Sequence, residues 1–300
     1  MKNTLELIQI LDAIDQNGSF EAAANKLHKV RSALTYTIQK FEENLGIKLY
    51  DRTHHRAKLT EAGWTLLNQG RDLINLNKQL IENIKQISSG WELMLSVAYD
   101  EIICLNPLFD LIKSFQIECS HTRFELHSEI LGGCIDALIS HRVDIALGFP
   151  GPLPSTNEFI FEPIGKVKFV FAVAPFHPLA KIKEPLSTEL IKTYHAIVAR
   201  DSARQMPLQT SMLLSDQNRL TFSNLALKRK AQILGLGVGF LPYHLIEKDI
   251  VEKKLVVKKV ERAQPPSYVY MGWNKTKMGK AHQWFLKKIK NKIFLRNLLK

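Results

Sequence analysis

The sequence predicts a multi-domain α+β protein, and three observations support this fold class. Residues 19–60 have the spacing of two short helices followed by a hairpin, and residues 61–90 form one long helical pattern. Residues 91–300 alternate between strand-like and helix-like runs. A chain of 300 residues with 45% hydrophobic residues is long and apolar enough for two or three domains, each with its own core.

The two short helices carry the most specific pattern. Ser19 can cap a first helix, which contains the three alanines at 22–24 and ends near Leu27. Alanines are small enough to let a second helix cross closely. The second helix has one apolar stripe at i, i+4, i+7 and i+11, formed by Leu34, Ile38, Phe41 and Leu45. Gly46 suits its C-cap, so the pair has the pattern of a helix-turn-helix.

Polar and basic side chains lie on the outer face of the second helix and in the hairpin after it. Residues 49–50 and 58–59 can pair as short strands, so that the loop between them forms a wing. Such side chains read base edges and hold phosphates. The residues expected to contact DNA are Arg31, Ser32, Thr35, Tyr36, Gln39, Lys40, Arg52, His54, His55 and Arg56. An ordinary helix pair in a globular core is the alternative, but it does not require all these features in this order.

The net charge of +12 comes mainly from the end of the chain. Residues 1–63 contain nine Lys or Arg and eight Asp or Glu, and residues 64–250 contain eighteen and nineteen. Residues 251–300 contain fourteen basic and two acidic residues. The predicted DNA-binding stretch, residues 27–60, contains seven basic and three acidic residues, which gives it a local charge of +4. That local value is the one relevant to DNA. The basic run at 287–296 is better explained as the solvated face of an amphipathic helix than as a further DNA or membrane contact.

A long helix is predicted from about residue 60 to residues 88–90. Apolar residues repeat along it every seven positions, at Leu66, Leu73, Leu80 and Ile87, with Leu76 and Ile84 beside them. Gly70 and Asn77 weaken one row of this seam. A DNA-binding module needs two copies to read two half-sites, so we interpret the helix as a linker that pairs two protomers. The alternative is a helix packed on its own chain.

The rest of the chain alternates strands and helices, which predicts mostly parallel sheets with helical layers. The strand-like runs are residues 93–98, 123–130, 143–148, 168–174, 196–198, 219–222 and 237–242. The helix-like runs are residues 107–115, 133–140 and 225–234. Ligands bind such sheets at the carboxyl ends of the strands. The residues expected there are Tyr99, Asp100, Glu129, Leu131, Gly148, Phe149, Ser202, Arg204 and Gly237.

With these motifs, the stretch from Leu5 to Thr60 resembles the N-terminal domain of the LysR-type transcriptional regulators (LTTR). Residues 31–40 look most like the YhaJ-like branch of that family. Residues 91–300 resemble its effector domain, a pair of α/β subdomains of periplasmic-binding-protein type. The local matches are residues 143–148 and 235–242. The chain departs from the usual family residues at Val30, Arg31, Tyr36 and Thr37, so the resemblance does not imply the base preference of the common members.

The resemblance implies a domain organisation. Residues 1–60 would form the winged helix-turn-helix DNA-binding domain, residues 61–90 the linker helix for dimerisation, and residues 91–300 the effector-binding domain. Subdomain I would comprise residues 91–164 plus 267–300, and subdomain II residues 165–266. Two crossovers between the subdomains would form a hinge that can close on a small ligand.

The function implied is a DNA-binding transcription factor regulated by an unidentified small-molecule co-inducer. It would bind a partly palindromic promoter site in double-stranded DNA as a homodimer or a homotetramer, and RNA polymerase is a further candidate partner. A ligand-independent architectural DNA binder is the alternative, and an α/β enzyme with an accessory DNA module is a third hypothesis.

Several classes are not expected from the sequence. It has no P-loop, no dinucleotide-binding spacing and no His-Glu-x-x-His, so we expect no enzyme, no catalytic residue, no metal and no cofactor. No apolar run of about 18 residues predicts a membrane span, and three cysteines without a close pair predict reduced thiols, so a cytoplasmic protein is expected.

The residues after the first effector strand suggest a ligand class. Family members that hold carboxylates commonly place Ser or Thr there, at a helix start, whereas this chain has Asp100 and Glu101. Two carboxylates would compete with an anion for the positive end of that helix. We therefore expect a neutral, aromatic or cationic effector, although Ser202 and Arg204 favour a carboxylate, which Arg can bind bidentately.

Overall fold

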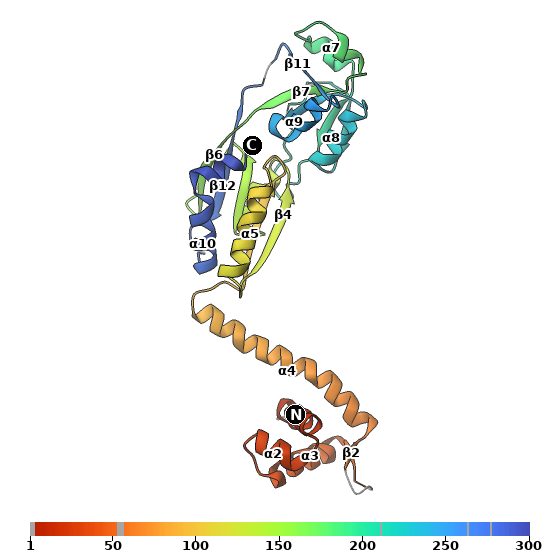
Figure 1. Cartoon of the computed structure of the whole chain (residues 1–300), viewed down its shortest axis with the longest axis vertical. Helices are drawn as coiled ribbons and strands as arrows, with labels where there is room; N and C mark the ends of the chain where they lie inside the picture. The colour runs from red at the N-terminus through yellow and green to blue at the C-terminus, as the bar shows by residue number, and fades with distance from the viewer. Residues whose placement is uncertain (1–3, 53–56, 211, 263, 277) are drawn as a thin grey trace. The chain divides into compact units, whose positions relative to one another are not determined.

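The structure is a computed structural model and describes residues 4–52, 57–210, 212–262, 264–276 and 278–300. The chain divides into two compact units, residues 1–89 and residues 90–300. Figure 1 shows the first unit as red and orange helices and the second as a mixture of helices and strands, coloured yellow to blue.

The first unit is a small helical domain with a two-stranded hairpin. Its elements are α1 (Thr4–Asn17), α2 (Phe20–Lys26), α3 (Arg31–Leu45), β1 (Tyr50–Asp51), β2 (Lys58–Leu59) and α4 (Glu61–Ser88). Leu7 and Leu11 of α1 pack with Leu34 of α3 in its core, because residues at this spacing share one face of a helix. The hairpin pairs Tyr50 with Leu59 in antiparallel register. The predicted helices, hairpin and long helix are all present.

Helix α4 crosses α1 at Gly70. A Cβ atom at this position would lie 2.4 Å from Cγ2 of Ile8, so glycine is needed for this close approach. Beside it, the guanidinium of Arg71 lies 2.8 Å from the carboxylate of Asp12 and 2.5 Å from that of Asp15. Gly70 therefore belongs to a face of α4 that packs on its own chain, which is why it interrupts the apolar seam.

A second apolar face of α4 is exposed. This face consists of six residues, each with 47% to 62% of its surface exposed: Leu73, Leu76, Leu80, Ile81, Ile84 and Ile87. Leu66, the first residue of the predicted seven-residue repeat, is partly buried and packs against the core of its own domain. A long helix that exposes an apolar face in water is typical of an interaction surface.

The larger sheet of the second unit has five strands in the order β4-β3-β5-β12-β6. They are β3 (Met94–Asp100), β4 (Arg123–Glu129), β5 (Ile145–Pro150), β6 (Phe159–Val167) and β12 (Ser267–Asn274). The helices packed on it are α5 (Asn106–Glu118), α6 (Gly133–Ile139), α10 (Lys280–Ile289) and α11 (Lys292–Asn297). β3 is parallel to β4 and β5, but β12 is antiparallel to β5 and β6, because the chain returns to this sheet from the other subdomain.

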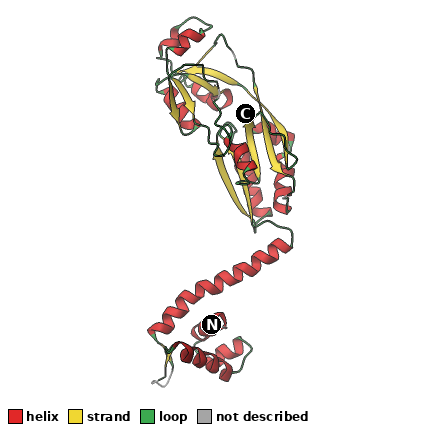
Figure 2. Ribbon diagram, turned by 180° about the vertical axis from the view of Figure 1, so that it is seen from behind, coloured by secondary structure: helices red, strands yellow, loops and turns green. Residues whose placement is uncertain are grey.

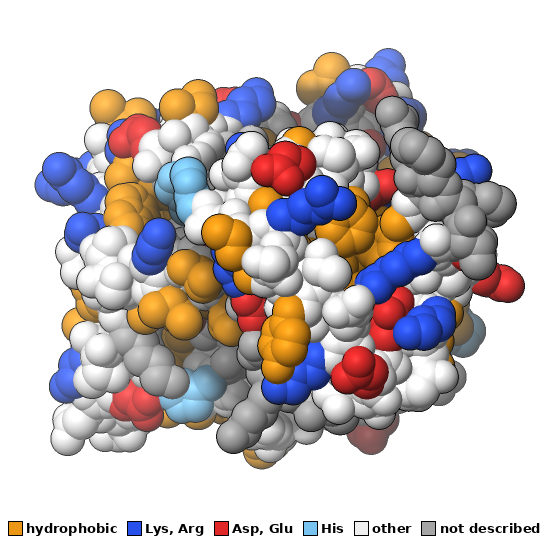
Figure 3. Space-filling model, turned by 90° about the horizontal axis from the view of Figure 1, so that it is seen from below, with side chains coloured by type: hydrophobic (Ala, Val, Ile, Leu, Met, Phe, Trp, Pro, Cys, Tyr) orange, Lys and Arg blue, Asp and Glu red, His pale blue; other side chains and the backbone are white. Residues whose placement is uncertain are grey.

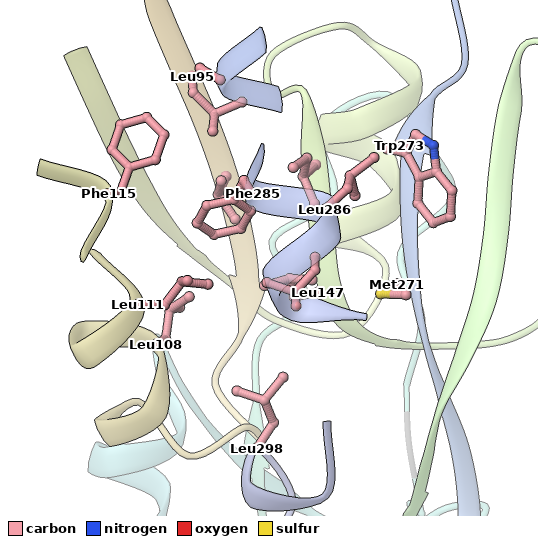
Figure 4. Close-up of a cluster of buried hydrophobic side chains, with 14 of the residues drawn as sticks. Leu95, Leu108, Leu111, Phe115, Leu147, Met271, Trp273, Phe285, Leu286 and Leu298 are labelled. Carbon is pink, nitrogen blue, oxygen red and sulfur yellow. The ribbon is translucent and has the colours of Figure 1, made fainter. Parts of the chain in front are cut away.

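Aromatic side chains fill the core on one side of this sheet. The ring of Phe115 from α5 lies 6.2 Å from that of Phe285 from α10, and 5.6 Å from that of Trp284. Figure 4 shows Phe285 and Leu286 of α10 directed at the strands that carry Leu147 and Leu95. This packing attaches the last helices to the first subdomain.

The smaller subdomain contains the remaining strands. These are β7 (Phe169–Val173), β8 (Ala196–Ala199), β9 (Arg219–Phe222), β10 (Gly239–Pro242) and β11 (Val256–Lys258). Its helices are η1 (Pro178–Lys181), α7 (Thr188–Lys192), α8 (Leu225–Ile233) and α9 (Tyr243–Val251). β7 is antiparallel to β10 and β11, whereas β8 and β9 are parallel. The chain passes between the two sheets twice, from β6 to β7 and from β11 to β12 (Figure 2).

Two differences from the sequence-based expectation have physical reasons. The sheets are less parallel than predicted, because β12, β10 and β11 all pair antiparallel. Strand β6 was not predicted, since Glu162, Pro163 and Gly165 interrupt its pattern. β6 is an edge strand, where a proline without an N–H group is tolerated.

The basic run at 287–296 is not one helix, because α10 ends before Asn291 and this side chain caps α11, accepting the N–H of Ile293 at 2.8 Å. Lys288 lies 3.3 Å from Glu118, and Lys290 lies 2.8 Å from Glu162. Part of the basic charge is therefore paired within the second unit. On the face drawn in Figure 3, Lys and Arg side chains are scattered among other residues.

The three cysteines, Cys104, Cys119 and Cys134, are free thiols. Burial raises the pKa of the Cys119 thiol to about 11, which keeps it protonated at neutral pH. Among the helices of the described residues, none is both long enough and apolar enough to cross a membrane.

Candidate functional site

Helices α2 and α3 form the helix-turn-helix. The side chain of Ser19 accepts a hydrogen bond from the N–H of Ala22 at 3.1 Å, which confirms the predicted cap. Ala23 and Ala24 are fully or almost fully buried and leave room for α3 to pack against α2. Gly46 ends α3 with a left-handed φ of 67°, also as predicted.

The outer face of α3 is open to a partner. Its exposed residues are Arg31, Ser32, Tyr36, Gln39 and Lys40, and Thr35 is partly buried beside them. Tyr36 exposes 62% of its surface, and Nζ of Lys40 lies 5.6 Å from its ring centroid, within cation–π range. Val30 precedes α3 without giving it a side-chain cap.

A buried carboxylate joins α3 to the hairpin. Oε1 of Glu42 accepts the backbone N–H of Leu49 at 2.7 Å and that of Tyr50 at 3.0 Å. Oε2 lies 3.7 Å from Nζ of Lys48 and 3.7 Å from the guanidinium of Arg52. The side chain of Glu42 is only 1% exposed, so it fixes the first hairpin strand, and with it Arg52, relative to α3.

The sequence pattern did not predict that Glu42 is buried, and its prediction that Leu45 is buried is wrong. Leu45, predicted for the buried stripe, is 52% exposed, because it lies in the last turn of α3, beyond Phe41, the last residue of this helix that packs on the core. The buried positions Leu34, Ile38 and Glu42 follow each other at four-residue spacing. That spacing was the available signal for Glu42.

The structure brings part of the predicted DNA contacts together. Arg31 and Thr35 of α3 line one open surface hollow with Arg52 and with Lys58 of β2. The hollow has a volume of about 720 Å³ and lies between the start of α3 and the hairpin. The other predicted wing residues, His54, His55 and Arg56, lie outside the described residues.

In the second unit, Asp100 lies at the end of β3 and is almost completely buried. Its carboxylate accepts the N–H of Ile102 at 3.0 Å and that of Leu131 at 2.8 Å. Burial raises the pKa of Asp100 to about 8, although these two hydrogen bonds oppose the shift. Asp100 therefore ties together the loops that follow β3 and β4.

Glu101 reaches across to the smaller subdomain. Its Oε1 accepts the hydroxyl of Ser128 at 2.9 Å, and its Oε2 accepts the N–H of Leu225 at 2.6 Å, at the start of α8. The sequence placed this carboxylate beside the helix that follows β3, but it lies at the positive end of α8 instead. The reason is that α5 begins only at Asn106, whereas α8 faces Glu101 directly.

Two further contacts bridge the subdomains. The hydroxyl of Ser202 accepts the N–H of Ile130 at 2.8 Å and donates to Glu129. Nε2 of His244 donates to the carbonyl of Ile102 at 2.8 Å. Together with the contact of Glu101, these bonds hold the two subdomains against each other.

An ion-pair network supports this arrangement. Arg142 lies 2.9 Å from Glu129 and 2.8 Å from Asp136. Asp136 also accepts the backbone N–H groups of Arg204 at 3.1 Å and of Met206 at 2.7 Å. The segment around Arg204 is thus held through its main chain, and Ser202 and Arg204 line a shallow surface hollow.

Two cavities of about 60 Å³ each lie in or beside the cleft between the subdomains. The cleft cavity is lined by Asp100, Leu131, Phe169 and Leu225, among others. The inner cavity lies in the smaller subdomain and is lined by residues that include Gln217 and Arg262. The residues that line both are Val198, Met212, Lys228 and Phe240.

Of the predicted effector contacts, Asp100 and Leu131 line the cleft cavity. Phe149 is fully buried in a core cluster, and Tyr99 packs on another. Gly148 has a φ of +86° beside Ile103. At Gly237 a Cβ would lie 2.3 Å from the carbonyl oxygen of His195, so it serves a close approach of the backbone.

Comparison with known proteins agrees with both halves. Residues 5–64 match the bacterial regulatory helix-turn-helix family of lysR type, and residues 88–293 match the LysR substrate binding domain. The chain is 40% identical to the HTH-type transcriptional regulator YeeY of Escherichia coli over 285 residues. This matched stretch covers 95% of this chain and 92% of YeeY. It is 36% identical over 286 residues to YhaJ of Escherichia coli, covering 95% of each.

The chain belongs to the LysR family of transcriptional regulators. As a LysR-type regulator it combines a helix-turn-helix that binds DNA with a domain that binds a small-molecule effector. The relatives are named as transcriptional regulators, not as enzymes.

Solved structures support the fold of this LysR-type regulator. An OxyR mutant of Corynebacterium glutamicum has a TM-score of 0.63 at 15% identity, covering 99% of this chain and 93% of that one. The Vibrio cholerae virulence activator AphB, at 19% identity, has a TM-score of 0.50 and covers each chain fully. At these identities the likeness concerns the fold alone.

Proposed function

We propose that this LysR-type regulator reads a partly palindromic promoter site in double-stranded DNA with the outer face of α3. The observation that carries the proposal is the exposure of Tyr36 and Gln39 on that face, next to a hollow that Arg31 and Arg52 both line. Side chains such as Gln39 can bond base edges, whereas Arg31, Lys40 and Arg52 suit phosphates. His54, His55 and Arg56, which lie outside the described residues, remain proposed phosphate contacts.

Two protomers would pair through the exposed face of α4. A continuous apolar face from Leu73 to Ile87 supports this, because α1 already covers the other side of the helix at Gly70. Pairing would give the two reading heads that two half-sites require. Two such dimers would form the homotetramer, and RNA polymerase would be a partner at the promoter.

The cleft between the subdomains would hold the effector. Phe169 and Phe240 line the cleft cavity, which suits an aromatic or other flat apolar body. Binding would shift the balance between closed and open subdomains and so couple the cleft to DNA. The domain boundaries at residues 60, 90, 164 and 266 follow the same organisation, and the regulator would act in the cytoplasm without being an enzyme.

Genome-wide mapping of bound DNA, followed by footprinting of the strongest sites, tests this function. We expect two half-sites about one helical turn apart, each protected by one protomer. Binding without any shared sequence would favour the ligand-independent architectural binder. That alternative is less well supported, because it leaves the cleft cavity and the effector domain without a use.

A further inference from the structure

Lys228, at the wall of both cavities, is a cation without a partner among the residues that the structure describes. It lies on α8 and lines the cleft cavity as well as the inner cavity. No hydrogen bond or ion pair engages its ammonium group within the described part of the chain. Burial lowers the pKa of Lys228 to about 8, since an apolar surrounding disfavours its charge.

The nearby carboxylates are occupied by other groups. Asp100 accepts two backbone N–H groups, and Glu101 accepts the hydroxyl of Ser128 and the N–H of Leu225. Both line the cleft cavity, yet neither pairs with Lys228. The negative charge of Glu101 is directed to the start of α8, so it does not neutralise the ammonium group of Lys228.

The neighbouring cation on the same helix shows the contrast. Arg229 is paired with Asp249 of α9 through both ends of its guanidinium, with Nη2 2.6 Å from Oδ1. An unpaired charge in a partly buried, apolar site costs stability, so a protein tends to keep one only where something else compensates it. An anion that enters the cavity would supply that compensation.

The surroundings limit the rest of the ligand. Apart from Lys228 and the two engaged carboxylates of Asp100 and Glu101, the cleft cavity is lined by apolar and aromatic residues, with Ile130, Phe169 and Phe240 among them. Each cavity has a volume of about 60 Å³. Each is less than half the roughly 150 Å³ cavity that accepts benzene in a protein core, so the ligand must be compact, and a ring would enter only as the subdomains open.

We propose that Lys228 binds the negatively charged group of the effector, and that the effector is a compact monoanion with a flat apolar body. The inference rests on the proposed effector function of the cleft and names its ligand class. It replaces the expectation of a neutral or cationic effector, because Glu101 is engaged at α8. Arg262, which lines the inner cavity, would add positive potential behind Lys228.

Matched probes on the full-length protein test this class. Benzoate, benzamide and benzylamine share one ring and differ in charge, and their binding is measured by titration calorimetry. Lys228→Met keeps the apolar stem and removes the charge. The control is Lys230→Met on the same helix, since Lys230 is exposed and lines neither cavity.

We expect benzoate to bind the wild-type protein about tenfold to hundredfold more tightly than benzamide, as a charge-assisted hydrogen bond would give. Lys228→Met should abolish this preference without weakening benzamide, and Lys230→Met should preserve it. An equal affinity for benzoate and benzamide, a preference for benzylamine, or no benzoate binding at millimolar concentration overturns the proposal. So does an unchanged preference in Lys228→Met.

Binding of a selected DNA site is measured on the same proteins. If the protein binds specific DNA but does not bind benzoate in preference to benzamide, the proposed ligand class is wrong and the regulator function stands. If neither wild-type protein nor variants bind specific DNA, the proposed function itself fails. Loss of a buried charge should leave the melting temperature of Lys228→Met equal to or above that of the wild type.

Discussion

Oε2 of Glu42 lies 3.7 Å from the guanidinium of Arg52, while Oε1 of the same carboxylate accepts two backbone N–H groups at the start of the hairpin. One buried side chain therefore holds α3 and the first strand of the hairpin together. Glu42 therefore positions Arg52, one of the predicted DNA contacts, without being exposed itself.

Glu42→Ala should lower the free energy of unfolding of the first unit by about 1–3 kcal/mol, because it leaves the N–H groups of Leu49 and Tyr50 buried without an acceptor. Glu42→Gln keeps an acceptor oxygen and should cost less. The exposed neighbour Glu43 is the control, and Glu43→Ala should change stability by about 0.5 kcal/mol at most. Urea unfolding measures all three, and equal effects of Glu42→Ala and Glu43→Ala would contradict the assignment.

Gln39→Ala and Tyr36→Ala should reduce discrimination between specific and random DNA by roughly 1–3 kcal/mol each, if these side chains read bases. Arg52→Ala should instead weaken binding to all sequences alike and reduce the salt dependence by about one counterion. Fluorescence anisotropy with both DNA types at several salt concentrations separates the two cases. A parallel loss on specific and random DNA for Gln39→Ala would refute its role in base readout.

Leu80→Lys should weaken dimerisation at least about tenfold, since burying a leucine side chain is worth roughly 1.5–3 kcal/mol and a lysine introduces charge. Leu80 is 56% exposed in the single chain, so folding should be unaffected. Sedimentation velocity reads the oligomeric state and circular dichroism the fold. Gln79→Lys, at the next and exposed position, should stay dimeric; an unchanged dimer in Leu80→Lys would place the interface elsewhere.

The raised pKa of Asp100 predicts a pH dependence of stability. Burial raises this pKa from 3.8 to about 8, so between these values the folded protein holds a proton that the unfolded chain releases. The free energy of unfolding should therefore fall as pH rises from about 4 to about 8. Asp100→Asn should lose this slope in urea unfolding, even if it is less stable at every pH. Asp110→Asn, at an exposed carboxylate, should keep the wild-type slope.

Local patterns were sufficient for much of the fold. The cap at Ser19, the end of α3 at Gly46 and the start of α4 after Thr60 depend on neighbours within a few residues, and the sequence predicted all three. Strand β6 was missed because its proline and glycine resemble loop residues, and an edge position that tolerates them is a property of the whole sheet.

The site depends on contacts between distant positions. Glu101 meets Leu225 and Asp136 meets Arg204, pairs that are 124 and 68 residues apart, and no local spacing indicates them. The same applies to Lys228: its place on a helix could be predicted, but its lack of a partner among the described residues results from tertiary packing. Glu42 is an intermediate case, because its buried position follows the helical period while its polar nature concealed it.

Three of the hydrogen bonds between the subdomains, made by Glu101, Ser202 and His244, lie at the ends of separate segments. Each would be exchanged for a bond to water on opening, and such an exchange is worth only about 0.5–1.5 kcal/mol. These three bonds together therefore contribute a few kcal/mol to closure, and about 5.5 kcal/mol of differential affinity is what a ligand needs to reverse a 1:99 population. The free energy with which a single small molecule binds through one well-placed charge is therefore enough to shift the balance between the open and closed states.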